Sequence, residues 1–231
     1  PTDWIQIGAD LRLRHVYAKN IITQNSEAPN RDNEWHYGRY RTRLSAKFNL
    51  DKNVDFNTRL VWEFRHWDHP SHLPSHTDFD EMIFDHFNLT VRNLFDMPLT
   101  GVFGRQDIIL GDGWLVFDGT PADGSRTIFF DAARFTYKLS EQTTADMVFI
   151  YQFADENKWL SPINHESDSR RITNYQDEKG AILYLSHKAD ESTTIDGYYI
   201  YKEDNQSRST AVINEHSGVD SEIHTLGTRY V

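Results

Sequence analysis

The chain contains no cysteine, and this absence removes several classes of protein at once. Without cysteine among its 231 residues, it has no disulfide framework, no thiolate metal site and no cysteine nucleophile. It also has no run of about 18 apolar residues, which excludes a membrane-spanning helix. No signal-peptide pattern follows Pro1, so we expect either a mature polypeptide or a cytosolic one.

Basic residues are in the minority, and catalytic signatures are missing. The 24 Lys and Arg residues against 35 Asp and Glu residues give a net charge of -11, which argues against a nucleic-acid binder that depends on phosphate contacts. There is no Gly-x-Ser-x-Gly elbow, no His-Glu-x-x-His helix and no phosphate-binding glycine-rich loop. Adjacent carboxylates such as Asp80 and Glu81 are too common in an acidic chain to indicate a glycosidase. We therefore expect neither an enzyme nor a cofactor.

What the sequence does contain is alternation with a period of two. Over residues 38–48 the even positions carry the apolar and aromatic side chains, and the odd positions are polar and mostly basic: Arg39, Arg41, Arg43, Ser45 and Lys47. Since successive strand side chains point to opposite faces, this pattern predicts a β-strand with one apolar and one cationic face. In a soluble sandwich the apolar face would pack inward, whereas in a transmembrane barrel it would meet lipid.

The same alternation repeats along the chain and predicts ten strands in one all-β domain, residues 1–231. The strands are expected at about 4–16, 35–50, 54–67, 82–94, 99–106, 128–139, 143–153, 180–188, 193–203 and from 221 onward. Turns of about three to five residues follow the even-numbered strands, and connections of roughly 13 to 25 residues follow the odd-numbered ones. This rhythm and the long strands are typical of a transmembrane antiparallel up-and-down β-barrel.

A membrane barrel fixes the direction of the cationic face. An arginine on the lipid face at mid-membrane costs roughly 2 to 4 kcal/mol, so Arg39, Arg41 and Arg43 should face a wet interior. We expect an arginine ladder there, because guanidinium groups attract carboxylates and exchange one weak contact for the next. Pairing with wall carboxylates such as Asp55 and Glu63 is the alternative role. The expected members of the ladder are Arg12, Arg14, Arg39, Arg41, Arg43, Arg59, Arg65, Arg92, Arg105 and Arg134.

Five motifs rich in glycine and aspartate lie in the middle of the chain. They are Gly104-Arg105-Gln106-Asp107, Gly111-Asp112-Gly113-Trp114-Leu115-Val116, Asp118-Gly119-Thr120-Pro121, Gly124-Ser125-Arg126-Thr127 and Phe130-Asp131-Ala132-Ala133-Arg134. With the early Arg-x-Arg-x-Arg strand and the closing His224-Thr225-Leu226-Gly227-Thr228-Arg229, they closely resemble the signature of the bacterial alginate export family of outer-membrane proteins. The resemblance covers most of the chain.

The resemblance implies a barrel of about 18 strands in the Gram-negative outer membrane, with a positively charged lumen through which an anionic polysaccharide leaves the periplasm. Ten strands fall short of that number, and the chain ends at Tyr230-Val231 without the terminal Phe or Trp usual in such proteins. We therefore expect a partial barrel completed by further strands or by a partner, because sheet edges cannot stay unpaired in lipid. Lipid, lipopolysaccharide and periplasmic export components are the other expected partners.

The glycine- and aspartate-rich segment 107–126 is a candidate gating loop folded into the lumen, since its glycines permit tight bends. An outer loop without gating is the alternative. The residues expected to act in gating are Asp107, Asp112, Asp118, Asp123 and Arg126.

A histidine-rich loop suggests metal binding, but its spacing is not that of a known site. The residues concerned are His66, His69, His72 and His76 beside Asp68 and Asp78. Because Pro70 and Pro74 break any helical register, we expect a solvated loop and no metal site. Calcium in the acidic loop 154–178 is a further alternative.

We expect an outer-membrane channel that passes an anionic, alginate-like polysaccharide by passive diffusion. Within transport, the alternative is a general or anion-selective porin for small solutes. Outside transport, the alternatives are an adhesin or assembly scaffold and, among enzymes, a barrel lipase or deacylase that uses a serine and a histidine.

Overall fold

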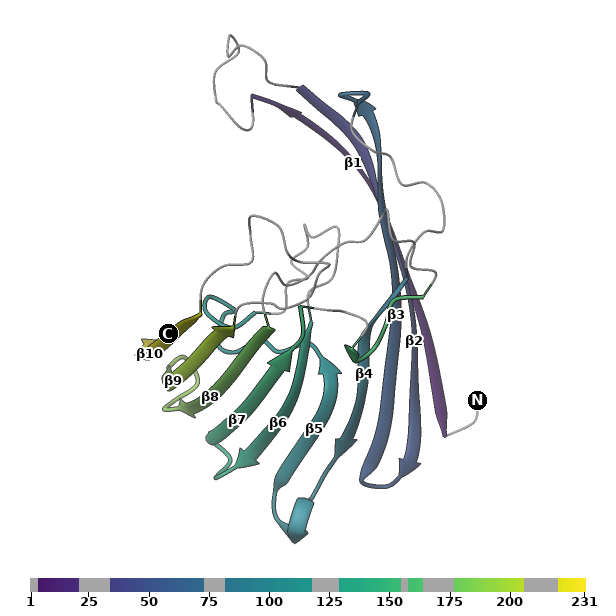
Figure 1. The fold of residues 1–231 in the computed structure, drawn as a ribbon. Coiled ribbons are helices and arrows are strands. Elements are labelled where there is room, and N and C mark those ends of the chain that lie inside the picture. The colour runs from purple at the N-terminus through teal and green to yellow at the C-terminus, as the bar shows by residue number, and fades with distance from the viewer. Residues whose placement is uncertain are drawn as a thin grey trace.

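The protein, seen in a computed structural model, forms a single ten-stranded antiparallel sheet in which each strand pairs with the next one along the chain (Figure 1). The structure describes residues 4–20, 34–72, 82–117, 129–154, 158–163, 177–205 and 220–231. No helix in these ranges is long and apolar enough to cross a membrane.

The strands confirm the prediction of ten up-and-down antiparallel strands. They are β1 (Ile5–Lys19), β2 (Glu34–Asp51), β3 (Val54–His69), β4 (Ile83–Val91), β5 (Leu99–Gln106), β6 (Phe130–Lys138), β7 (Thr143–Gln152), β8 (Asp177–Lys188), β9 (Thr194–Asn205) and β10 (Ser221–Tyr230). A short 3-10 turn, η1 (Leu94–Asp96), lies between β4 and β5. The hairpins β2-β3, β4-β5, β6-β7 and β8-β9 therefore turn at the same end of the sheet, as the connection lengths predicted.

The sheet is strongly curved, and its two edge strands, β1 and β10, lie far apart (Figure 1). β3 pairs with β4 only over residues 54–61, so the rest of β3 extends beyond the other strands together with β1 and β2. These three strands form a tall ribbon at one side of the curved sheet (Figure 1).

The two faces of the sheet have opposite character. The convex face carries large apolar side chains that remain exposed, which is unusual for a surface in water. Among them are Ile7, Leu11, Leu13, Leu44, Met147, Phe149, Leu183, Leu185, Ile195 and Leu226, each more than 40% exposed. The strand registers place the arginines of β2 on the opposite, concave face.

Two local features of β4 and β5 shape the concave face. The register between β3 and β4 shifts after Arg59, so that Asp85 is an extra residue between Phe84 and His86. Such a β-bulge re-aims side chains, and here it brings Asp85 under Arg59. On β5, Gly104 has a φ of +115°, and a Cβ atom there would come within 2.4 Å of the Phe87 carbonyl oxygen, so only glycine fits.

Candidate functional site

Strands β1 to β3 place three arginines directly opposite one another on the concave face. Arg14, Arg39 and Arg65 are register partners at one level of the sheet. Like charges that face each other across strands destabilise a sheet, and the Tyr37 ring lies 5.5 Å from the Arg65 guanidinium carbon. The three guanidinium groups therefore concentrate positive charge at this level of the sheet.

The next level toward the hairpin turns is more nearly balanced. Here Arg41 lies between Arg12 and the buried carboxylate of Glu63. Arg41 also donates a hydrogen bond of 3.2 Å to Asp10, whose side chain is half exposed. The positive excess thus decreases from the loop end of the ribbon toward its turn end.

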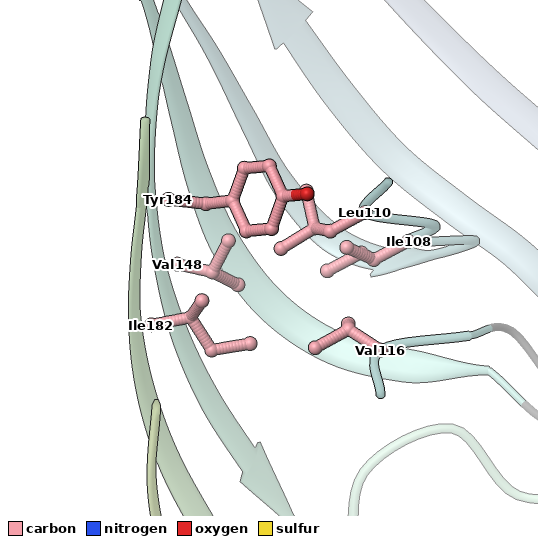
Figure 2. Packing of buried hydrophobic residues seen from close by; sticks show 6 residues of the cluster. All are labelled: Ile108, Leu110, Val116, Val148, Ile182 and Tyr184. Atoms are coloured by element: carbon pink, nitrogen blue, oxygen red, sulfur yellow. The ribbon is translucent and has the colours of Figure 1, made fainter. Parts of the chain in front are cut away.

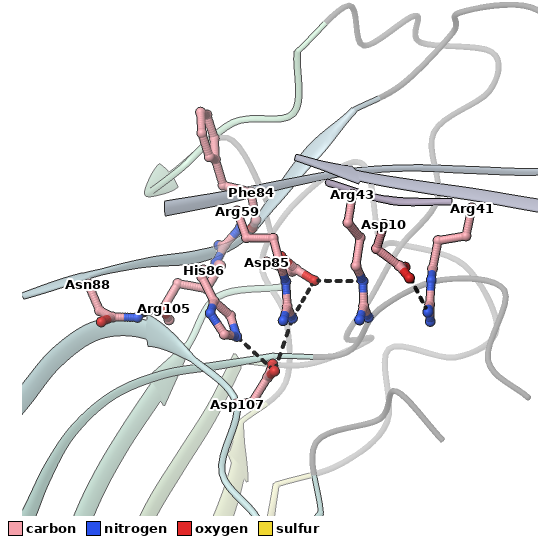
Figure 3. A network of polar contacts seen from close by, with 10 residues as sticks. All are labelled: Asp10, Arg41, Arg43, Arg59, Phe84, Asp85, His86, Asn88, Arg105 and Asp107. Carbon is pink, nitrogen blue, oxygen red and sulfur yellow. Dashed lines mark hydrogen bonds and ion pairs between the residues drawn. The ribbon is translucent and has the colours of Figure 1, made fainter. Parts of the chain in front are cut away.

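Below these levels, the bulge residue Asp85 organises two further arginines. Asp85 is fully buried and accepts two hydrogen bonds of 2.7 Å from Arg59. Arg43 approaches the same carboxylate at 3.8 Å. Figure 3 shows these three side chains on one side of the ribbon, with Phe84 on the other. The two guanidinium groups thus compensate for the cost of burying the Asp85 carboxylate.

Asp107, the first residue after β5, connects this network to the following loop (Figure 3). Its carboxylate lies 2.9 Å from Arg59 and 2.7 Å from Nε2 of His86. Burial alone would raise the pKa of Asp107, but the hydrogen bond and charge of His86 and those of Arg59 outweigh it and lower the pKa below its usual value. Asp107 therefore stays ionised through the physiological range.

Residues 107–117, which we call the strap, lie against the concave face of β7 and β8. Ile108, Leu110 and Val116 from the strap pack against Val148, Ile182 and Tyr184 of the sheet (Figure 2). Burial of each strap side chain contributes about 1.5 to 3 kcal/mol. An ion pair between Asp112 and Arg229 adds about 1 kcal/mol or less, since Asp112 is 73% exposed. The apolar contacts are therefore the main anchor of the strap.

Another buried carboxylate lies where the strap reaches the far edge of the sheet. Asp196 is 1% exposed. Its carboxylate accepts a hydrogen bond of 2.5 Å from the Tyr184 hydroxyl and one of 2.6 Å from Arg229. Since Arg229 also contacts Asp112, the strap spans the concave face from Arg59 to Arg229. The sequence resemblance included Arg229, but it gave no signal for Asp196.

The remaining arginines of the expected ladder are tied to single carboxylates. Arg92 pairs with Asp55 near the turn end, and Arg134 contacts Asp146 at 2.8 Å. Arg105 differs from both, because it is in register with Phe87 on the face that carries the apolar side chains of β4.

Arg105 is nevertheless fully enclosed. It donates two hydrogen bonds of 2.9 Å to Asp131, and its guanidinium carbon lies 3.6 Å from the centroid of the Phe129 ring. At 5% exposure it stabilises the junction of β5 and β6 and is separate from the arginines of β1 to β3.

The gating and metal predictions are covered only in part by the described residues. Asp107 and Asp112 both lie on the strap, whereas Asp118, Asp123 and Arg126 lie outside the described ranges. His76 and Asp78 of the histidine-rich loop lie outside them as well. In the described ranges, there is no group of three or more imidazole or carboxylate side chains that could bind a metal ion.

Comparison of the chain with protein-family models and with curated proteins found no match. The alginate export resemblance therefore remains a prediction from the motifs.

Proposed function

We propose that the protein is an outer-membrane β-barrel channel through which an anionic polysaccharide of the polyuronate type diffuses passively. The observation that carries this proposal is that Arg14, Arg39 and Arg65 lie side by side on the concave face, while the convex face is rich in exposed apolar side chains. Apolar outside and cationic inside is the arrangement that a lipid-embedded, anion-conducting barrel requires.

The spacing of the arginines favours a polymer as the solute. Successive side chains on one face of a strand are about 7 Å apart, so Arg39, Arg41 and Arg43 form three steps along β2. An extended polyanion can contact several steps at once and exchange them one by one. A small anion contacts only one arginine at a time. A porin for small solutes is the alternative function, and block by uronate oligomers distinguishes it from a polysaccharide channel.

The curved sheet requires further strands to close. In the ranges described, β1 and β10 each have a single neighbouring strand, and unpaired edges are not tolerated in lipid. We propose that additional strands, from the same polypeptide or from a partner, complete the barrel.

Single-channel recording in planar bilayers tests the proposed function. We expect an anion-selective current that uronate oligomers block in a concentration-dependent manner, because they occupy several arginine levels together. A current that these oligomers leave unchanged would instead indicate a small-solute porin. Absence of any current would indicate a scaffold or adhesin and would contradict channel function.

We also propose that the strap narrows the lumen, and Asp107 supplies the test. Because the pKa of Asp107 lies below its usual value, its contacts are present at neutral pH and are lost only when the pH falls below the usual titration range of an aspartate. We expect acidification to loosen the base of the strap and raise the conductance, and Asp107→Asn to show the raised value at pH 7. A loss of about 1 kcal/mol changes the closed-to-open ratio about fivefold.

The matched control for Asp107 is Asp96→Asn, in the exposed turn between β4 and β5. It should behave like the wild type at every pH. Identical conductance of the Asp107→Asn and wild-type proteins at pH 7 would show that the strap base does not restrict the path.

A further inference from the structure

Trp114, near the tip of the strap, is the most exposed large apolar side chain of the described residues, at 86%. It lies between the buried strap residues Leu110 and Val116. The neighbouring Leu115 is also exposed, at 47%, and it lines the same cavity as Trp114. Grouped exposed apolar side chains are typical of a binding surface.

The exposure of Trp114 is fixed by the turn that precedes it. Leu110 N–H donates to the Val116 carbonyl, and Gly113 N–H donates to the Leu110 carbonyl, both at 3.1 Å. Gly111 and Gly113 have φ values of +60° and +73°, in the left-handed region that glycine adopts readily. A Cβ atom on Gly111 would also approach the Tyr184 hydroxyl at 2.7 Å. The turn is thus tightly defined, and it holds the indole on the concave face.

The surroundings of Trp114 combine an aromatic wall with a cation. A cavity of about 70 Å³ lies beside it, lined also by Tyr184, Tyr198 and Arg229. The Tyr184 and Tyr198 rings are stacked, with centroids 5.8 Å apart. Arg229 is held by Asp196 from one side and by Asp112, which is largely exposed, from the other.

We propose that Trp114 is a carbohydrate-stacking residue, on which the C–H face of a pyranose ring packs while the carboxylate of the sugar competes with Asp112 for Arg229. This inference rests on the proposed function and specifies it. A uronate sugar has a flat apolar face, hydroxyl groups at its rim and a carboxylate, and the indole, the Tyr198 hydroxyl and the guanidinium match these three features. A small inorganic anion has no apolar face, so Trp114 distinguishes a saccharide chain from a simple anion.

The test is Trp114→Ala in the full-length protein, with block of the single-channel current by uronate oligomers and chloride conductance as the two readouts. We expect the blocking concentration to rise about tenfold while the chloride conductance stays unchanged. Trp114→Phe should retain part of the block, because its ring still offers an apolar face. In detergent, the same oligomers should quench the tryptophan fluorescence of the wild type, and Trp114→Phe should remove that quenching.

Trp4→Ala is the matched control, because Trp4 is also exposed, at 56%, but lies beside Phe48 at the start of β1. It should leave both readouts unchanged. Equal block of Trp114→Ala and the wild type would overturn the assignment of Trp114, even if the channel itself is confirmed. A wild type that conducts but is not blocked would instead overturn the polysaccharide function, and the stacking role with it.

Discussion

Replacing Arg14, Arg39 and Arg65 together by serine is expected to lower the anion-to-cation permeability ratio roughly tenfold, because each charge contributes about 0.6 kcal/mol at 7 Å in water before screening. These three arginines are register partners on the concave face. None of their register partners in β1 to β3 is a carboxylate. Reversal potentials in a salt gradient measure the ratio directly.

The matched control removes one arginine and one carboxylate that form a neighbouring ion pair. Arg41→Ser with Asp10→Asn leaves the net charge of the concave face unchanged, since the two side chains contact each other at 3.2 Å. Its permeability ratio should stay close to that of the wild type. Unaltered selectivity in the triple variant would remove these arginines from the conducting path and leave them a purely structural role.

From the level of Arg14, Arg39 and Arg65 we also expect block by uronate oligomers to depend on salt concentration. Block that depends on several guanidinium contacts weakens as salt screens them, over a Debye length of about 10 Å at 0.1 M. Stacking on Trp114 is far less sensitive to salt, since it depends on apolar contact. The two contributions can therefore be separated by comparing block at low and high ionic strength.

The sheet could be predicted from the sequence because alternation is a local signal. Residues 38–48 show both faces of β2 directly, and the observed strand extends only a few residues further at each end. The prediction was less accurate where polar residues form the ends of strands. β8 begins at Asp177 rather than near residue 180, because Glu178 and Lys179 pair with the end of β9 and Lys179 contacts Glu203 at 3.2 Å.

The end of β4 was missed for a different reason. β4 ends at Val91 rather than near residue 94, and the turn that follows uses positive φ angles at Asn93 and Phe95. Asparagine adopts this conformation fairly readily, but for a bulky phenylalanine it is uncommon. Composition alone therefore did not mark the boundary.

The candidate site was predictable only as far as it depends on alternation. The facing of Arg39, Arg41 and Arg43 follows from the strand period. The position of Asp85 does not, because a β-bulge shifts it by one residue and reverses its expected face. The strap was recognisable from its glycines, but its contact with Val148 and Ile182 joins residues far apart in the sequence, which no local pattern reveals.

Asp85→Asn is expected to destabilise the protein by about 3 to 5 kcal/mol, which is the usual effect of removing one partner of a buried ion pair. Asp85 is 0% exposed and holds both Arg59 and Arg43, so the substitution leaves two guanidinium groups facing a neutral amide. Urea unfolding in detergent, followed by tryptophan fluorescence, gives the free energy of unfolding.

Two further variants show whether the loss of stability in Asp85→Asn comes from the buried charge network. Asp10→Asn removes a carboxylate from an exposed pair with Arg41 and should cost less than about 1 kcal/mol. In an Arg59→Met background, Asp85→Asn should cost much less than in the wild type, because the main partner of the carboxylate is already absent. Equal costs in the two backgrounds would show that Asp85 acts through packing at the bulge. A large coupling would instead show that this buried carboxylate holds Arg59 in place on the concave face.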